Sequence, residues 1–220
     1  MPTPIGHALA GVAAAWIADL APGDRAWRTA TPSASWYERA GNGVTLACAF
    51  LATLPDIDLV WLPWFPRQHR TVTHSIGAVI VVGLTALIVR TVSDTSDTTS
   101  HHSHRIQRVR RVRPLRVALM CAAAYATHLL LDWLGVDNYP PYGLQALWPF
   151  SDAWFISNLN LFAQTARLRL LTPAVIRLNL IAIAQEAAIL MPILVALWLV
   201  RVKALAGLPT ELASRDHAPQ

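Results

Sequence analysis

The long apolar run Leu178–Val200 constrains the fold of this chain more than any other feature. Its only ionisable side chain is Glu186. A helix that crosses a bilayer needs about 20 predominantly apolar residues, so this run predicts a membrane-spanning helix. Four other stretches are apolar but shorter or interrupted: Ser75–Val89, Val117–Leu131, Val44–Leu54 (resuming after Pro55 as Leu59–Phe65) and, most weakly, Ile5–Leu20.

The composition agrees with a membrane environment. Hydrophobic residues make up 54% of the 220 and charged residues 14%, against about 25% charged in soluble domains. So few charged residues cannot make the whole surface of a folded protein of this size compatible with water. The high apolar content excludes a disordered chain. Two cysteines, Cys48 and Cys121, both in apolar stretches, exclude a disulfide scaffold. We therefore predict an all-α integral membrane helical bundle of about four to five transmembrane helices, some of them short or broken.

The polar segments define the expected domain organisation. Residues 1–205 are expected to form a single membrane-embedded domain, and residues 206–220 a polar C-terminal tail. Within the domain, residues 91–116 are rich first in Ser, Thr and Asp, then in His, then in Arg. This composition predicts a flexible basic loop.

The basic residues predict the orientation, because cytoplasmic loops carry an excess of Lys and Arg. If all five stretches cross, five of the 18 basic residues fall on the outer side and the rest on the side of the basic loop and the C-terminus. The outer five are Arg67, Arg70, Arg167, Arg169 and Arg177. The basic loop and the C-terminus are therefore predicted to be cytoplasmic, in a multi-pass protein of a bacterial inner membrane.

Seven chemically active side chains fall on the opposite, outer side in this topology. They are His7, His69, His74, His128, Asp56, Asp58 and Asp132. The orientation was predicted from Lys and Arg alone, so the placement of these seven His and Asp side chains on one side is an independent result. Ionisable groups at membrane depth are costly unless they pair, bind a metal or face water. The seven therefore predict a metal site near the outer face.

Local spacing supports this site. His128 and Asp132 share a helical face at i and i+4, roughly 18 Å and 24 Å along the helix from Arg116. Asp56 and Asp58 would point the same way if the chain there is extended. His69 is expected in a loop, and His74 at the opening of the next helix. Imidazole and carboxylate ligands suit one or two divalent ions, zinc first, with manganese or magnesium as alternatives.

Each residue also has a structural explanation. His7 suits a helix cap or an interfacial position, His128 and Asp132 a hydrogen-bonded pair, and the two aspartates a helix start. His101, His102, His104 and His217 lie in the basic loop or the tail and are read as solvated. The six arginines between Arg105 and Arg116 are expected to meet anionic lipid head groups rather than nucleic acid.

Several motifs resemble one known family, the bacterial membrane-bound metal-dependent hydrolases, a LexA-regulated inner-membrane group long described as a domain of unknown function. The matching motifs are PIGHALAG around His7, LPDID at 54–58, HRTVTHS at 69–75, HLLLDW at 128–133 and YGLQALWPFSD at 142–152. They cover most of the chain in the expected order. More distantly, the His and Asp pattern is similar to zinc-dependent phospholipase C. The chain departs from the family in its Pro140–Pro141 pair and in having Ser157, Asn158 and Asn160 where the family has acidic residues.

The resemblance implies a multi-helix membrane protein with a divalent metal site. We hypothesise hydrolysis of a phosphodiester or ester, in a lipid or lipid-linked substrate, by a metal-activated water. Asp58 is expected to be a ligand or the base that positions water, and Arg70 to pair with a phosphate oxygen. The alternatives are a metal-ion or proton transporter and a DNA-associated protein using the basic loop. The oligomeric state stays open.

Overall fold

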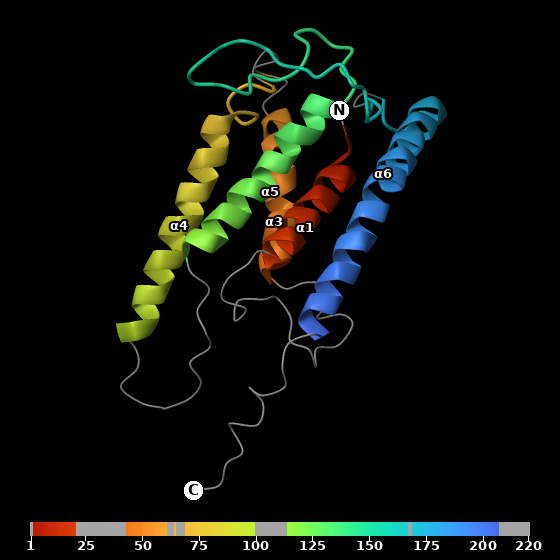
Figure 1. Cartoon of the computed structure of the whole chain (residues 1–220). Helices are drawn as coiled ribbons and strands as arrows, with labels where there is room; N and C mark the ends of the chain where they lie inside the picture. Colours follow the sequence, from red (N-terminus) through yellow and green to blue (C-terminus); the bar gives the residue numbers. More distant parts are fainter. Residues whose placement is uncertain are drawn as a thin grey trace, which may run out of the picture.

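The chain folds into a bundle of α-helices, as the sequence predicts (Figure 1). The computed structural model describes residues 2–20, 43–60, 64, 69–99, 114–166 and 169–206. Within these ranges there are helices and isolated β-bridges but no strands. In chain order, the elements are α1 (Pro4–Leu20), α3 (Gly43–Thr53), the 3-10 helix η2 (Leu54–Val60), α4 (Ile76–Thr99), α5 (Pro114–Leu134) and α6 (Pro173–Ala206). The four histidines of the basic loop and the tail lie outside the described residues.

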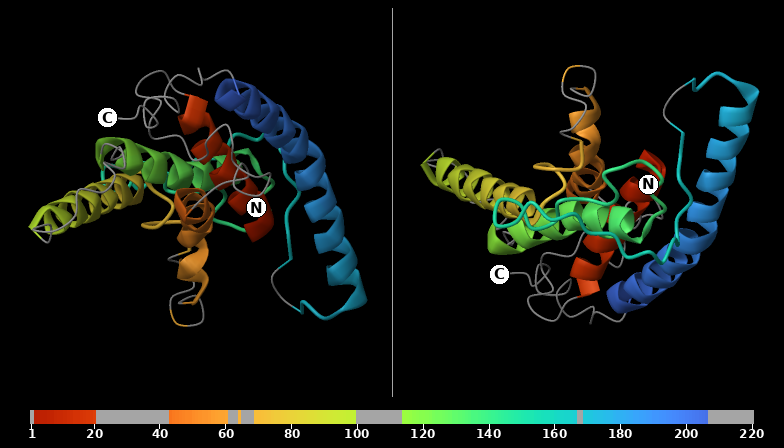
Figure 2. Two further views of the ribbon diagram at one scale, coloured as in Figure 1. Left: turned by 90° about the horizontal axis from the view of Figure 1, so that it is seen from below. Right: turned by 90° about the horizontal axis from the view of Figure 1, so that it is seen from above.

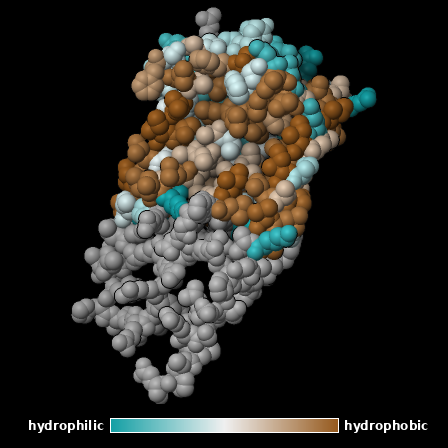
Figure 3. All heavy atoms as spheres, viewed as in Figure 1, coloured by the Kyte–Doolittle hydropathy of each residue, from teal (hydrophilic) through white to brown (hydrophobic). Residues whose placement is uncertain are grey.

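Four of the described segments are long and apolar enough to cross a membrane. They are Gly43–Val60, Ile76–Ser93, Pro114–Leu134 and Pro173–Lys203. The apolar part of α1, Pro4–Ala18, is shorter. Figure 3 shows hydrophobic residues over the sides of the bundle. Large apolar side chains such as Leu84 on α4 and Ile181 on α6 are exposed there, as expected for a surface that faces lipid. The predicted helical membrane architecture is confirmed.

The helices begin where their sequences favour it. Proline occupies the first position of α1, α5 and α6, where its missing N–H costs nothing and its fixed φ suits a helix. Ser75 caps α4, since its hydroxyl oxygen accepts a hydrogen bond from the backbone N–H of Ala78 at 3.2 Å. Thr3 caps α1 in the same way, accepting from the N–H of Gly6.

Three helices form the centre of the bundle. Helices α1, α3 and α5 contact one another, while α4 packs on α5 and α6 packs on α1. Figure 2 shows α4 and α6 at opposite margins. A cluster of Ala15, Cys48, Met120 and Ala124 fills the space between the three central helices. These mostly small side chains allow a close approach of helices within a membrane.

Gly11 makes the closest of these approaches possible. A Cβ atom at this position would lie 2.4 Å from the carbonyl oxygen of Cys48 and 2.7 Å from the Cβ of Ala52. Any side chain at residue 11 would therefore force α1 away from α3. This contact sets the position of the first turn of α1, which carries His7, relative to η2.

The connection after α5 closes one end of the bundle (Figure 1). The backbone N–H groups of Ile76 and Gly77 donate to the carbonyl oxygens of Ala146 and Trp148. These two residues lie in or beside the LWPFSD segment, which therefore satisfies the free N–H groups at the start of α4. Because His74 lies two residues before α4, this cap also fixes the backbone that carries it.

Two local expectations differ from the structure. Residues 54–60 form a 3-10 helix rather than extended chain, since proline is tolerated in the first helical turn. At three residues per turn, Asp56 and Asp58 therefore point in different directions. In addition, α4 continues to Thr99, so residues 91–99, expected in the loop, are helical.

Candidate metal centre

Four elements bring the seven predicted side chains together. His7 comes from the first turns of α1, Asp56 and Asp58 from η2, His69 and His74 from the turns before α4, and His128 and Asp132 from α5. Tertiary packing thus assembles residues that are more than 120 positions apart in the sequence.

Four side-chain atoms converge at the centre of the cluster. They are Nε2 of His74, Nε2 of His128, Oδ1 of Asp56 and Oδ2 of Asp132. The two nitrogens are 3.1 Å apart. The Asp132 oxygen lies 3.4 Å from His74 and 3.3 Å from His128, and the Asp56 oxygen lies 3.7 Å from each. A tetrahedral zinc site with bonds of about 2.0–2.1 Å has ligand atoms about 3.4 Å apart, so the distances from the two histidine nitrogens to each other and to the two carboxylate oxygens suit a zinc-like ion.

The hydrogen bonds of the rings orient the histidines toward this centre. Nδ1 of His128 lies 2.8 Å from the carbonyl oxygen of Ala52. A carbonyl only accepts, so Nδ1 is the donor, and Nε2 is directed toward the centre of the cluster. Asp58 holds Nδ1 of His69 in the same way at 2.7 Å. Nδ1 of His74 lies 3.0 Å from the hydroxyl of Thr73 and 3.3 Å from Oδ2 of Asp58. Such partners fix the orientation of metal-binding imidazoles.

Asp58 is itself held by two further donors. Its Oδ2 accepts hydrogen bonds from the backbone N–H of Arg70 at 3.1 Å and from the hydroxyl of Thr73 at 2.8 Å. The carboxylate is thereby surrounded by donors on both oxygens. This arrangement favours a role for Asp58 in holding His69 and His74, instead of direct contact with an ion.

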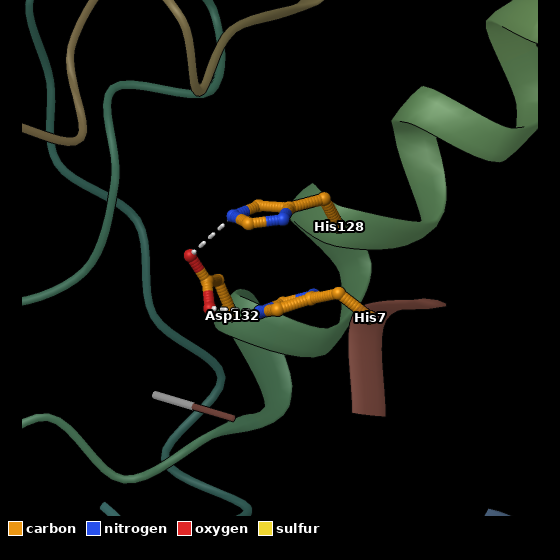
Figure 4. Close-up of side chains that lie close together, drawn as sticks. All are labelled: His7, His128 and Asp132. Carbon is orange, nitrogen blue, oxygen red and sulfur yellow. Dashed lines mark ion pairs between the residues drawn. The ribbon is translucent and has the colours of Figure 1, made fainter. Parts of the chain in front are cut away.

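His7 lies against the far side of the cluster (Figure 4). Its ring stacks on that of His128 with centroids 3.7 Å apart, and its Nε2 is 3.5 Å from Oδ1 of Asp132. The two oxygens of Asp132 therefore face different histidines. His7, His128 and Asp132 form one group that could hold an ion, and Asp56, His69 and His74 form another, so the residues fit one or two ions.

The cluster is buried, and some of its polar atoms lack hydrogen-bond partners. The side chains of His74 and His128 are 0% exposed, and those of His7 and Asp132 are 1% exposed. Among the described residues, neither ring nitrogen of His7 and neither oxygen of Asp132 forms a hydrogen bond. Buried polar atoms are costly when left without partners, and a cation between them removes that cost. The cluster therefore fits a metal ion in both chemistry and burial.

The pKa of His74 also indicates that the centre of the cluster favours a positive charge. Burial acts to lower the pKa of His74, but its contacts with Asp132, Asp56 and Asp58 outweigh burial and raise the pKa well above its ordinary value. In the metal-free protein, a proton on His74 therefore supplies the positive charge at the centre. A metal ion bound there would replace this proton.

The members of the cluster differ in exposure. The side chains of Asp58 and His69 are 10% exposed and that of Asp56 is 14% exposed, whereas the other members are closed off. Asp56, Asp58 and His69 are therefore the members of the cluster nearest to the surface.

Arg70 has a different environment from the one expected. Its guanidinium forms an ion pair with the buried carboxylate of Asp137 and donates to the carbonyl oxygens of Tyr139 and Pro141, each at 3.2 Å. Asp137 also accepts from the backbone N–H of Gly143 at 2.7 Å. The charge of Arg70 is thus neutralised within the protein, and the pair ties residues 137–143 to the turn that carries His69.

Sequence reasoning missed Asp137 and the carbonyl of Ala52. Asp137 lies in an irregular segment with no periodic pattern, and a backbone carbonyl has no signature in the sequence. Glu186 is the only ionisable residue of the apolar run Leu178–Val200, but its partner could not be inferred from the sequence. That partner is Thr3, at the start of α1.

The fold and this cluster define a class: helical integral membrane proteins with a buried group of histidines and aspartates that could hold a metal. Within that class, the chain belongs to the family described as YdjM inner membrane protein, whose family model matches residues 1–208. An inner-membrane location, as predicted, follows from this family. No curated protein and no solved structure matches the chain. The comparisons therefore add no support for similarity to metal-dependent hydrolases or phospholipase C.

Proposed function

We propose that this protein is a metal-dependent hydrolase whose site lies within the outer part of the membrane bundle. The observation that carries the proposal is the approach of carboxylate oxygens of Asp56 and Asp132 to Nε2 of both His74 and His128, with 3.1 Å between the two nitrogens and 3.3–3.7 Å from each nitrogen to each oxygen. The proposed ion is zinc, or alternatively manganese or magnesium. A divalent ion held there would lower the pKa of a bound water toward about 7 and polarise a phosphoryl or acyl oxygen.

His69 and Asp58 are the proposed proton-transfer pair. His69 is among the members of the cluster nearest to the surface, and its Nδ1 is 2.7 Å from Asp58. In this proposal, Nε2 of His69 accepts a proton from the attacking water, and Asp58 stabilises the imidazolium that forms. Asp58 would thus act on the reaction through His69.

The proposed substrate is a phosphodiester or ester in a lipid or lipid-linked molecule. The sides of the bundle are apolar, and the least buried members of the cluster, Asp56, Asp58 and His69, are 10–14% exposed, which favours a head group that is already at the membrane surface. The buried cluster of Ala15, Cys48, Met120 and Ala124 lies between the three central helices. Its apolar character favours a hydrolase over a transporter, because a transporter needs polar groups along a path to the other side.

Metal analysis of the purified protein tests the proposal. We expect wild-type protein in detergent to hold a stoichiometric divalent metal and to cleave a chromogenic phosphodiester or ester. Asp132→Asn should lose both properties. Asp152→Asn is the matched control, because Asp152 is exposed on the connection after α5. A wild type without stoichiometric metal, or an Asp132→Asn variant that keeps metal and activity, contradicts the proposal.

A further inference from the structure

Glu186 is a buried ionisable residue that the proposed reaction does not use. It lies within the spanning part of α6 and is 1% exposed. Its carboxylate contacts the start of α1: the backbone N–H of Thr3 donates to Oε1 at 2.7 Å, and the Thr3 hydroxyl donates to Oε2 at 2.5 Å. An ionisable side chain at this depth is expensive unless it has such partners.

The start of α1 is shaped to receive this carboxylate. Negative groups are stabilised at a helix N-terminus, where unpaired N–H groups carry partial positive charge. Residue 6 is glycine, and a Cβ there would lie 2.5 Å from Oε2 of Glu186. Any side chain at this position would displace the carboxylate from the helix end. Glu186 and Gly6 therefore form a matched contact between α6 and α1.

This contact is one helical turn from the metal cluster. The backbone N–H of His7 donates to the carbonyl oxygen of Thr3 at 3.1 Å, so the residue held by Glu186 also carries the turn that positions His7. The ring of His7 in turn stacks on His128 and faces Asp132. In Figure 4 the three side chains are seen together, with His7 arriving from α1.

We propose that Glu186 is a positioning residue for the metal centre: by anchoring Thr3, it sets the place of His7 against His128 and Asp132. The inference rests on the metal centre proposed above. It assigns to α6, which contributes none of the seven clustered side chains, a role in holding the centre from outside. Residues that orient metal ligands commonly change metal affinity by about 10–100-fold when replaced.

Titration of full-length protein in detergent with Co²⁺ alone, followed by visible absorption, tests the role of Glu186. We expect Glu186→Ala to weaken Co²⁺ binding by about 10–100-fold and to change the absorption bands that report ligand geometry. Glu186→Gln keeps an acceptor for the Thr3 N–H and should recover part of the affinity. Gly6→Ala should weaken binding as well, while Gly43→Ala is the matched control, because a Cβ there meets nothing within 4 Å.

Paired variants separate positioning from general stability. If Glu186 acts through His7, adding Glu186→Ala to a His7→Ala protein should not weaken Co²⁺ binding further. Adding Glu186→Ala to a His69→Ala protein should weaken Co²⁺ binding as much as it does in the wild type. Equal losses in both backgrounds would show a merely structural role and overturn the inference. If Glu186→Ala does not fold, Gly6→Ala and Glu186→Gln decide the question by the same cycle.

Two outcomes distinguish this inference from the proposed function. Wild-type protein that binds no Co²⁺ overturns both the metal centre and the role of Glu186. Wild-type protein that binds Co²⁺, together with undiminished binding by Glu186→Ala, overturns the Glu186 inference alone. Deuterium exchange of the metal-free protein adds an independent readout, since Glu186→Ala should speed exchange in the first turn of α1 relative to Gly43→Ala.

Discussion

The Nε2 atoms of His74 and His128 face each other at 3.1 Å, between carboxylate oxygens of Asp56 and Asp132. Two unprotonated imidazole nitrogens at this distance repel unless a positive charge lies between them. Nδ1 of His128 donates to the carbonyl of Ala52, and the charge between the two rings comes from a proton or from a bound ion. This relationship makes metal binding at the centre a competition with a proton.

Metal affinity should therefore fall as the pH falls. Because the pKa of His74 is raised in the metal-free protein, His74 keeps its proton to a higher pH than an ordinary histidine and must lose it when a metal binds. Below that raised pKa, affinity should rise by up to about tenfold per pH unit, and it should level off above it. Calorimetric titration with Zn²⁺ in buffers of different ionisation enthalpy measures the proton release. Affinity that does not change with pH would contradict the assignment of His74.

His69→Gln should separate proton transfer from metal binding. In the proposed reaction, His69 accepts a proton and is not one of the four central donors, so this variant should keep its metal but lose about 10²–10⁴-fold in hydrolysis rate. His74→Gln, in contrast, should lose the metal. Elemental analysis and rate measurements on both variants provide the comparison. A His69→Gln protein that loses an ion would instead make His69 a ligand.

The ion pair between Arg70 and Asp137 should stabilise the fold. Their side chains are 8% and 2% exposed, and removing one partner of a buried pair leaves an uncompensated charge. Arg70→Leu or Asp137→Leu alone should lower the free energy of unfolding by about 3–5 kcal/mol. The double variant should lose less than the sum of the two. Arg177→Leu, on the exposed face of α6, is the control and should change stability by less than about 0.5 kcal/mol. Thermal or denaturant unfolding in detergent provides the measurement, and purely additive losses would contradict a coupled pair.

The predicted orientation can be tested by labelling introduced cysteines. Asp152→Cys lies on the exposed connection after α5 and should react with a membrane-impermeant maleimide in intact spheroplasts. Ser214→Cys, in the C-terminal tail, should react only after the membrane is permeabilised. The native Cys48 and Cys121 are buried and serve as an internal background. Reversed labelling would place the metal cluster near the cytoplasmic face.

The helical fold could be predicted because it depends on local properties. The lengths and apolarity of the segments that became α4, α5 and α6 are visible without any tertiary contact, since each spanning helix must satisfy its own backbone hydrogen bonds in lipid. The local predictions that were wrong concern segments whose conformation depends on neighbouring elements or on a single proline. The chain after Pro55 is helical where extended chain was expected, and α4 extends through polar residues to Thr99.

The sequence alone determined that this chain is a helical membrane protein, and it identified the seven side chains that gather at one place. The predicted position of all seven on one side of the membrane was sufficient to identify them, because ionisable groups are costly in lipid and therefore gather where they can pair, bind an ion or meet water. Only the tertiary structure decided how those side chains divide their work. It placed Asp58 behind His69 and His74, paired Arg70 with Asp137, and set Glu186 against Thr3. Such pairings depend on distances between helices that no periodic pattern records, because packing and not local sequence decides which polar atoms meet.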